Sequence, residues 1–324
     1  MSQKDKKPKA EKPVKPGADD RRRVLRRSVA WLVAVGVVAC GTVIGLKHLE
    51  QRILEGKDGS KSQSVRVTLA ERPQWMPAAL ADDLARELLP SGADYRQADL
   101  AKRVYERARA NPWIRRVRVA AKRGRDDKRI GVIEVHAEYR KPLARVLGPD
   151  GYYRFVDGEG FVLPPLQVPR WVVTVPAREG KETRQICYVS STDVPDDQRA
   201  RPIHYVTVKG VDEPSPGVGR KWPGDDVGDG LKLAKLVAAK SYANQIPMAD
   251  VHNWPLLRMY AQIRSSRRTE ILFGRFPQPG GDYVVPTQRK LSYLDTYVAE
   301  NGGRLAGLNR CLDLRLDQLY VTAN

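Results

Sequence analysis

The chain of 324 residues is poor in the residue types that build covalent or metal-linked frameworks. It has three cysteines and four scattered histidines, without HExxH, CxxC or paired zinc-ligand spacing. These absences exclude a disulfide-stapled scaffold and a structural zinc protein. Acidic residues are scarce beside basic ones, 38 against 57, and the formal charge of +19 predicts an acidic partner or phase. The length and the 41% hydrophobic content suit about two domains with real cores.

Long hydrophobic runs are also lacking, with one exception. Residues 28–46 form 19 positions without a charge, about 28 Å of helix, which predicts a single transmembrane helix. Residues 1–27 carry eleven basic and four acidic side chains, a formal charge of +7. We expect a disordered cytoplasmic tail drawn to anionic lipid, and a bulk that lies outside the cytoplasm. The predicted location is therefore the inner cell membrane, crossed once.

Two features of this hydrophobic run suggest roles other than a plain membrane span. The stretch ending at Cys40 resembles the lipobox that precedes a lipid-modified cysteine, but the long basic tail and the continued apolar run favour an uncleaved helix. Gly41 and Gly45 form a GxxxG, a spacing that pairs helices but arises often by chance in a glycine-rich span. Whether the segment at Cys40 is processed stays open.

A small α/β module follows a polar spacer at residues 47–64. Alternating apolar residues predict strands at 65–69, 114–122 and 133–139, and stripes of leucine and alanine predict helices at 77–89 and from a capping box at Asp94 to residue 111. The module, residues 65–144, should be a three-stranded sheet with two helices on one face. We expect Val117 and Val119 to face the helices and Arg118 to face solvent.

Residues 145–322 are expected to form a second domain of strands with two embedded helices. One helix is predicted at 230–243 with Asp229 as its N-cap, and the other at 287–301 before a Gly302–Gly303 stop. The whole chain is therefore predicted to be α+β, with a single transmembrane helix before the two folded domains.

The sequence contains no strong candidate for a catalytic, metal-binding or phosphate-binding site. Residues 224–230 lack the oxygen ligands of an EF-hand, and residues 217–221 lack the phosphate-binding glycine frame, so both are expected to be turns or loops. Asp157 and Glu159 could form an acid pair, although the flanking glycines favour a hairpin turn with solvated carboxylates. The basic run at 115–125 suits an alternately charged strand face better than a nucleic-acid interface. Cys187 and Cys311 are equally plausible as a disulfide or as two thiols.

Several segments in order resemble the FtsQ/DivIB family of bacterial cell-division proteins, whose POTRA domain has the strand, helix, helix, strand, strand order expected here. The resemblance covers about residues 25–322. Departures include Tyr139 in place of the family's usual glutamate and apparent insertions at 164–202 and 276–287. The segments that resemble family motifs are NPWI at 111–114, RKPLA at 140–144, YYRFVDGEGFV at 152–162, TEILFG at 269–274 and LDLR at 312–315.

The resemblance implies a POTRA-like βααββ module, a mixed β domain, and a non-catalytic scaffold of the division complex at the septum, without cofactor or metal. It implies binding of other membrane-bound division proteins as an added strand at a last strand, 316–322, close to Asn324. Nucleic acid is not expected as a partner, because the residues after Leu46 should lie outside the cytoplasm. The alternative function is a membrane-anchored envelope-polymer-binding protein or hydrolase that uses the POTRA-like module as a spacer. The expected partner-binding residues are Asp313, Leu314, Arg315, Leu316, Gln318, Leu319 and Tyr320.

Overall fold

The computed structural model describes residues 63–125, 130–176, 183–261 and 268–323, which belong to one compact unit. The predicted tail with its anionic-lipid partner, the hydrophobic run with Cys40 and most of the spacer lie outside the described residues. So does the tip of the loop between the second and third strands.

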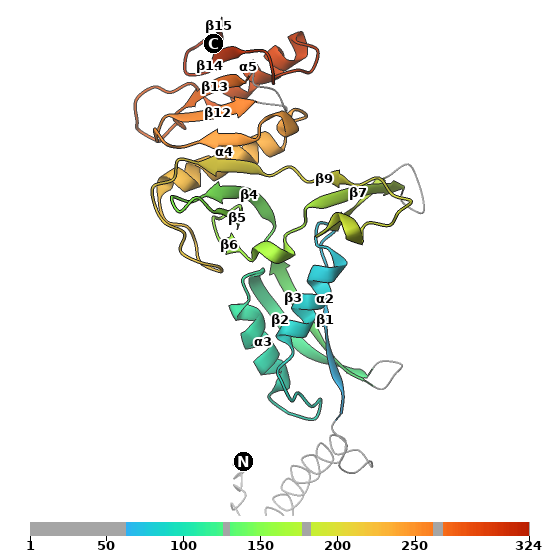
Figure 1. Cartoon of the computed structure of the whole chain (residues 1–324). Coiled ribbons are helices and arrows are strands. Elements are labelled where there is room, and N and C mark those ends of the chain that lie inside the picture. Colours follow the sequence, from blue (N-terminus) through green and yellow to red (C-terminus); the bar gives the residue numbers. More distant parts are fainter. Residues whose placement is uncertain (1–62, 126–129, 177–182, 262–267, 324) are drawn as a thin grey trace, which may run out of the picture. The chain divides into compact units, whose positions relative to one another are not determined.

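The first part of the described chain is a three-stranded sheet with two helices (Figure 1). The central strand β3 pairs in parallel with β1 and antiparallel with β2. Leucines of the helices and alternate strand residues are buried in one core. The predicted order of strand, helix, helix, strand, strand is confirmed. The bounds are β1 Val65–Leu69, α2 Ala78–Leu88, α3 Leu100–Ala110, β2 Ile114–Arg125 and β3 Gly131–Tyr139.

Helix α3 begins later than the capping-box pattern predicted. The Asp94 carboxylate accepts a hydrogen bond from the Arg96 N–H at 3.0 Å, and the Asp94 carbonyl accepts one from the Gln97 N–H at 3.0 Å. These bonds close a turn, so Asp94 caps no helix and α3 starts at Leu100.

Strand β2 contains an irregularity that the period-two pattern did not reveal. Its register against β3 shifts between Val117 and Val119, which accommodates an extra residue and changes the face of the following side chains. Val117 is 9% exposed and lies in the core, whereas Val119 is 50% exposed. The prediction for Val117 is confirmed and that for Val119 is wrong. Ala120 packs against the core beyond the irregularity.

The second part is a mixed nine-stranded sheet in the order β15-β14-β13-β12-β11-β10-β4-β5-β6 (Figure 1). Strand pairs β4–β10, β10–β11 and β13–β14 are parallel, and the other neighbours are antiparallel. The bounds are β4 Pro142–Leu147, β5 Tyr153–Asp157, β6 Val162–Leu163, β10 Val206–Lys209, β11 Met248–Asp250, β12 Leu257–Ala261, β13 Thr269–Gly274, β14 Arg310–Asp313 and β15 Tyr320–Ala323.

Two helices, α4 (Asp225–Ala238) and α5 (Thr287–Glu300), share a buried core with this sheet. The bounds of α5 agree with the prediction to within one residue. Helix α4 starts five residues before the predicted first residue, Gly230, and ends five residues before the predicted last residue, Ala243. A Cβ on Gly230 would lie 2.6 Å from Val208 Cγ1, so this glycine lets the helix approach β10 closely. Asp225 and Asp226 occupy the first turn, where carboxylates favour the helix dipole.

The segment read as an insertion at 164–202 forms structure of its own. It holds the short helix η1 (Pro165–Gln167), strands β7 (Trp171–Pro176) and β8 (Thr183–Tyr188), and the turn η2 (Ser191–Asp193). With β9 (Arg201–Pro202), the strands form a separate sheet in the order β8-β7-β9. A last short turn, η3 (Ala243–Gln245), follows α4.

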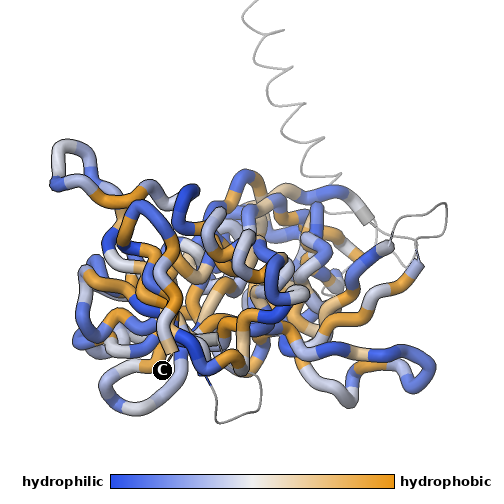
Figure 2. The backbone as a smooth tube through the Cα atoms, turned by 90° about the horizontal axis from the view of Figure 1, so that it is seen from above, coloured by the Kyte–Doolittle hydropathy of each residue, from blue (hydrophilic) through white to orange (hydrophobic). Residues whose placement is uncertain are grey.

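The prediction of a membrane-spanning helix needs correction. Among the described residues, no helix is long and apolar enough to cross a membrane. The longest described helices, α4 and α5, have 14 residues each, about 21 Å, and both carry charged side chains. Hydrophobic stretches of the described chain are short and interrupted by hydrophilic ones (Figure 2). The fold class with a transmembrane helix, and the single-pass location in the inner membrane with an extracytoplasmic bulk, are therefore not supported.

Candidate partner-binding edge

Strand β15 is the outermost strand at one end of the nine-stranded sheet. Its antiparallel partner is β14, with Asp313 opposite Tyr320 and Leu312 opposite Val321. All four residues of β15 are exposed. The sheet order places no described strand on its other side.

The directions of the peptide groups on β14 follow from one hydrogen bond. The Leu314 N–H donates to the Leu272 carbonyl of β13 at 3.0 Å. Peptide groups alternate in direction along a strand, so those of Leu312 also point to β13. Those of Cys311 and Asp313 consequently point to β15.

The register then fixes the directions on β15. Thr322 lies opposite Cys311 and Tyr320 lies opposite Asp313, so these two strand residues bond with β14. The N–H and C=O of Val321 and the N–H of Ala323 point the other way, to the open edge of the sheet. An edge of this kind is a template for another extended chain.

The turn before β15 is fixed by a carboxylate–guanidinium clamp. Asp313 accepts hydrogen bonds from Arg315 Nε at 2.8 Å, Nη2 at 2.6 Å and the backbone N–H at 3.0 Å. The Arg315 hydrogen bonds lower the pKa of the Asp313 carboxyl. A Cβ on Gly274, whose φ is +73°, would lie 2.7 Å from Arg315 Cγ, so the clamp packs on a position that glycine suits.

A second anchor holds the turn at Asp317. Its carboxylate accepts a hydrogen bond from the Tyr283 hydroxyl at 2.6 Å and lies 3.7 Å from Arg289 Nη1, and its carbonyl accepts one from the Tyr293 hydroxyl. Three exposed apolar or aromatic side chains of this turn and of β15, together with exposed Tyr283 that anchors the turn, are called the edge patch: Tyr283, Leu316, Tyr320 and Val321.

The structure changes several sequence-based assignments at this edge. The last strand begins at Tyr320, not at residue 316, because the turn occupies 314–319. Leu316 and Gln318 are exposed in that turn, Leu314 is fully buried, and Leu319 packs partly against the core. Tyr283 and the two other residues that anchor Asp317 were missed, because nothing in the local sequence links them to the last strand.

Lys290 lies beneath this edge without solvent exposure. Its Nζ donates to the Arg275 carbonyl at 2.7 Å and lies 4.6 Å from the centre of the Phe273 ring. Burial lowers the pKa of Lys290 to about 8, against a smaller opposite effect of Asp313. The folded chain therefore loses this proton at a lower pH than the unfolded chain.

We expect the stability of the wild type to rise relative to Lys290→Met as the pH increases. Between pH 8 and 9.5 the unfolded lysine keeps the proton that folded Lys290 releases, so the difference in free energy of unfolding should shift by about 2 kcal/mol. Urea melts at each pH measure it. Lys232→Met, at a largely exposed lysine, is the matched control and should show no such shift. A constant difference between wild type and Lys290→Met would contradict the assignment.

The suspected acid pair lies in a hairpin turn, as predicted. The N–H groups of Glu159 and Phe161 donate to Asp157 Oδ1 at 2.9 Å each. The expectation that both carboxylates are solvated is wrong for Asp157, which is buried. Its Oδ2 lies 2.6 Å from Arg140 Nη1, and the same nitrogen lies 3.0 Å from Glu159 Oε2. Arg115 also pairs with Glu159.

These ion pairs link the sheet β1-β3-β2 to the nine-stranded sheet. Arg140 directly follows β3, and Asp157 ends β5. Desolvation alone would raise the pKa of Glu159, but hydrogen bonds from Arg140 and Arg115 outweigh it and lower the pKa. The cluster is therefore arranged as a junction between sheets rather than as an acid–base pair.

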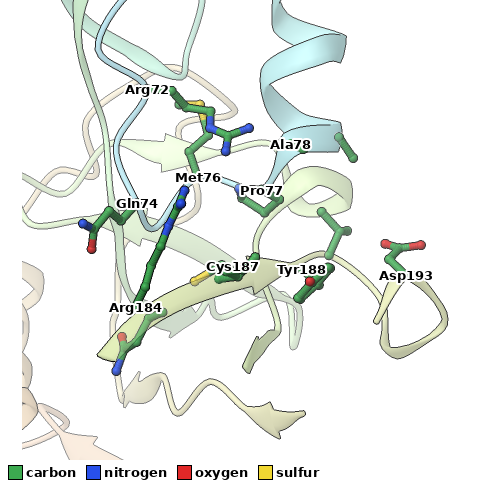
Figure 3. Close-up of a pocket in the computed structure, with 13 residues that line it drawn as sticks. Arg72, Gln74, Met76, Pro77, Ala78, Arg184, Cys187, Tyr188 and Asp193 are labelled. Carbon is green, nitrogen blue, oxygen red and sulfur yellow. The ribbon is translucent and has the colours of Figure 1, made fainter. Parts of the chain in front are cut away.

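A hollow of about 280 Å³ lies between the start of α2 and strand β8 (Figure 3). Burial raises the pKa of the Cys187 thiol there, and Lys141 offsets this in part. The thiolate that nucleophilic chemistry needs is thus disfavoured. Cys187 and Cys311 are both free thiols. The labelled lining residues are Arg72, Gln74, Met76, Pro77, Ala78, Arg184, Cys187, Tyr188 and Asp193.

The basic run on β2 is partly neutralised by its neighbour β3. Arg118 Nη2 lies 3.0 Å from Glu138 Oε1, and Arg123 pairs with Glu134. Lys122 is used inside the fold, because its Nζ donates to the carbonyls of Tyr95 and Gln97 at 2.6 and 2.8 Å. This arrangement agrees with an alternately charged strand face.

Comparison with known proteins adds no assignment. No model of a known protein family matches the chain, and no curated protein matches it in sequence. The resemblance to FtsQ/DivIB proteins therefore stays a prediction from sequence motifs.

Proposed function

We propose that this chain is a non-catalytic scaffold that binds an extended segment of a partner protein as an added strand beside β15. The observation that carries the proposal is the outward direction of the Val321 and Ala323 peptide groups on a fully exposed edge strand. Main-chain hydrogen bonds would supply affinity, and side chains of the edge patch would supply selectivity.

The side chains beside the edge define the partner's chemistry. Val321 lies opposite buried Leu312, so its row continues the apolar face of the sheet. Tyr320 lies on the opposite face, opposite Asp313. A fitting segment alternates apolar residues beside Val321 with polar or aromatic residues beside Tyr320.

We further infer that the partners are other proteins of the bacterial division complex. This part of the proposal is supported by the ordered resemblance to FtsQ/DivIB motifs, in which the LDLR segment at 312–315 precedes the last strand. In the described structure, two of its residues, Asp313 and Arg315, form the clamp that sets the start of β15.

Val321→Pro in the full chain should weaken partner binding at least ten-fold. Proline removes the outward donor while leaving the bonds of Tyr320 and Thr322 to β14. Losing one hydrogen bond of about 1 kcal/mol, together with the steric hindrance of the proline ring to an added strand, accounts for this factor. The measurement is quantitative recovery of division proteins with the tagged chain from dividing bacterial cells.

Val321→Thr, which keeps the N–H, is the matched control and should bind as the wild type does. Urea melts of both variants verify folding. Leu319→Pro is a poorer test, because Leu319 precedes β15 and packs partly against the core. Wild-type recovery of the partners by folded Val321→Pro protein would refute strand addition at this edge.

A further inference from the structure

A cleft of about 590 Å³ opens on the nine-stranded sheet, far along the strand order from β15. Ala144 and Val146 of β4 are buried in the core shared with α4, so Arg145 between them points to the opposite face of the sheet. The cleft is lined by Arg145, Tyr153, Phe155, Pro165, Arg170, Trp171, Pro202, Ile203, His204 and Tyr205.

Arg145 has no carboxylate partner among the described residues. Its Nη2 donates to Thr207 Oγ1 at 3.1 Å, and its guanidinium carbon lies 5.3 Å from the centre of the Tyr153 ring. Its Nε has no hydrogen-bond partner in the described structure. By contrast, two other arginines nearby in sequence have carboxylate partners. Arg140 is paired with Asp157, and Arg154 is paired with Asp150.

The other described residues of the lining add cationic or donor groups and no carboxylate. Arg170 is exposed and reaches only the Pro165 carbonyl, with Nη2 at 3.4 Å. His204 is exposed, and its Nε2 lies 3.0 Å from the Ile246 carbonyl. Among the described residues that line the cleft, none is an Asp, Glu, Asn or Gln.

Aromatic rings provide the apolar part of the cleft. Tyr153 is 53% exposed. Phe155 and Tyr205 stand edge to face, with ring centres 5.3 Å apart, and Trp171 is half-buried beside them in the lining. The Tyr205 hydroxyl is already used, since it donates to the Pro169 carbonyl at 2.8 Å.

We propose that this cleft binds an acidic peptide segment that carries apolar side chains. Carboxylates of the segment would pair with Arg145 and Arg170, and its apolar side chains would pack against the rings of Tyr153, Phe155 and Trp171. Charge complementarity supports this occupant, because the cleft has two arginines without carboxylate partners in the described chain.

Two other polymers fit less well. Carboxylate and amide side chains are strong acceptors for the hydroxyls of a saccharide, and the described lining residues include neither. Single-stranded nucleic acid needs a series of open ring faces on which its bases stack. Phe155 and Tyr205 instead pack against each other edge to face.

The test is fluorescence anisotropy with the full chain and a labelled heptapeptide that alternates glutamate with phenylalanine or leucine. Matched probes are the same peptide with lysine for glutamate, oligo-dT and oligogalacturonate. We expect binding of the acidic peptide alone. Arg145→Met and Arg170→Met should each weaken it at least five-fold, and Tyr153→Ala at least three-fold. Arg170 is exposed, so its variant keeps the test valid if Arg145→Met fails to fold.

Arg116→Met removes the same charge from an exposed position on β2 and should change the affinity less than two-fold. Val321→Pro should also leave peptide binding unchanged, which separates this cleft from the edge at β15. The proposal is overturned if the acidic peptide does not bind, if Arg116→Met weakens binding as much as Arg170→Met, or if oligo-dT or oligogalacturonate binds more tightly than the peptide.

Discussion

Arg140→Met should lower the free energy of unfolding by about 3–5 kcal/mol, because it leaves the buried Asp157 carboxylate without its cationic partner. The Arg140 side chain is 10% exposed and that of Asp157 is 5% exposed, so water compensates little for the lost pair. The guanidinium also stacks over the Phe161 ring at 3.6 Å. Chemical denaturation of the full chain at neutral pH measures the loss.

Two further variants test whether the lost stability comes from the unpaired, buried carboxylate of Asp157. Arg118→Met breaks an exposed pair with Glu138 and should cost less than about 1 kcal/mol. Adding Asp157→Asn to Arg140→Met removes the stranded charge while keeping Oδ1 as acceptor for Glu159 and Phe161, so it should recover part of the stability. A cost for Arg140→Met no larger than that for Arg118→Met would show that the cluster does not hold the sheets together.

Elements whose apolar pattern is local were predictable from the sequence. Strand β1 and helix α5 lie where alternation and a leucine stripe place them, because each buries one face against a single core. Helix α4 was misplaced because Gly230 looks like a helix boundary in sequence. Its actual role depends on the approach of Val208, a residue more than twenty positions away.

The candidate edge was predictable only in part. The motif ending at Arg315 correctly indicated a strand at the end of the sheet. However, the chain turns at the clamp between Asp313 and Arg315, so the strand begins only at Tyr320. The anchor from Tyr283 comes from an apparent insertion. The Arg145 cleft was not predicted, since its lining gathers residues from 145 to 205 that share no motif.

Val117→Asp and Val119→Asp should differ sharply in stability, although the residues are two apart on one strand. The irregularity between them buries Val117 and turns Val119 to solvent. Aspartate at 117 would bury an unpaired charge among the apolar residues of the first core and should cost about 4 kcal/mol. Aspartate at 119 stays exposed next to Arg118 and should change the free energy of unfolding by less than about 0.5 kcal/mol.

Urea melts of the two variants measure this difference directly. A regular strand without the irregularity would place both side chains on the same face, and both variants would then lose similar stability. Ala120→Asp provides an independent check, because Ala120 packs against the core after the shift. It should destabilise the fold more than Val119→Asp does. Equal costs for Val117→Asp and Val119→Asp, or a larger cost at 119 than at 120, would contradict the register of β2 against β3.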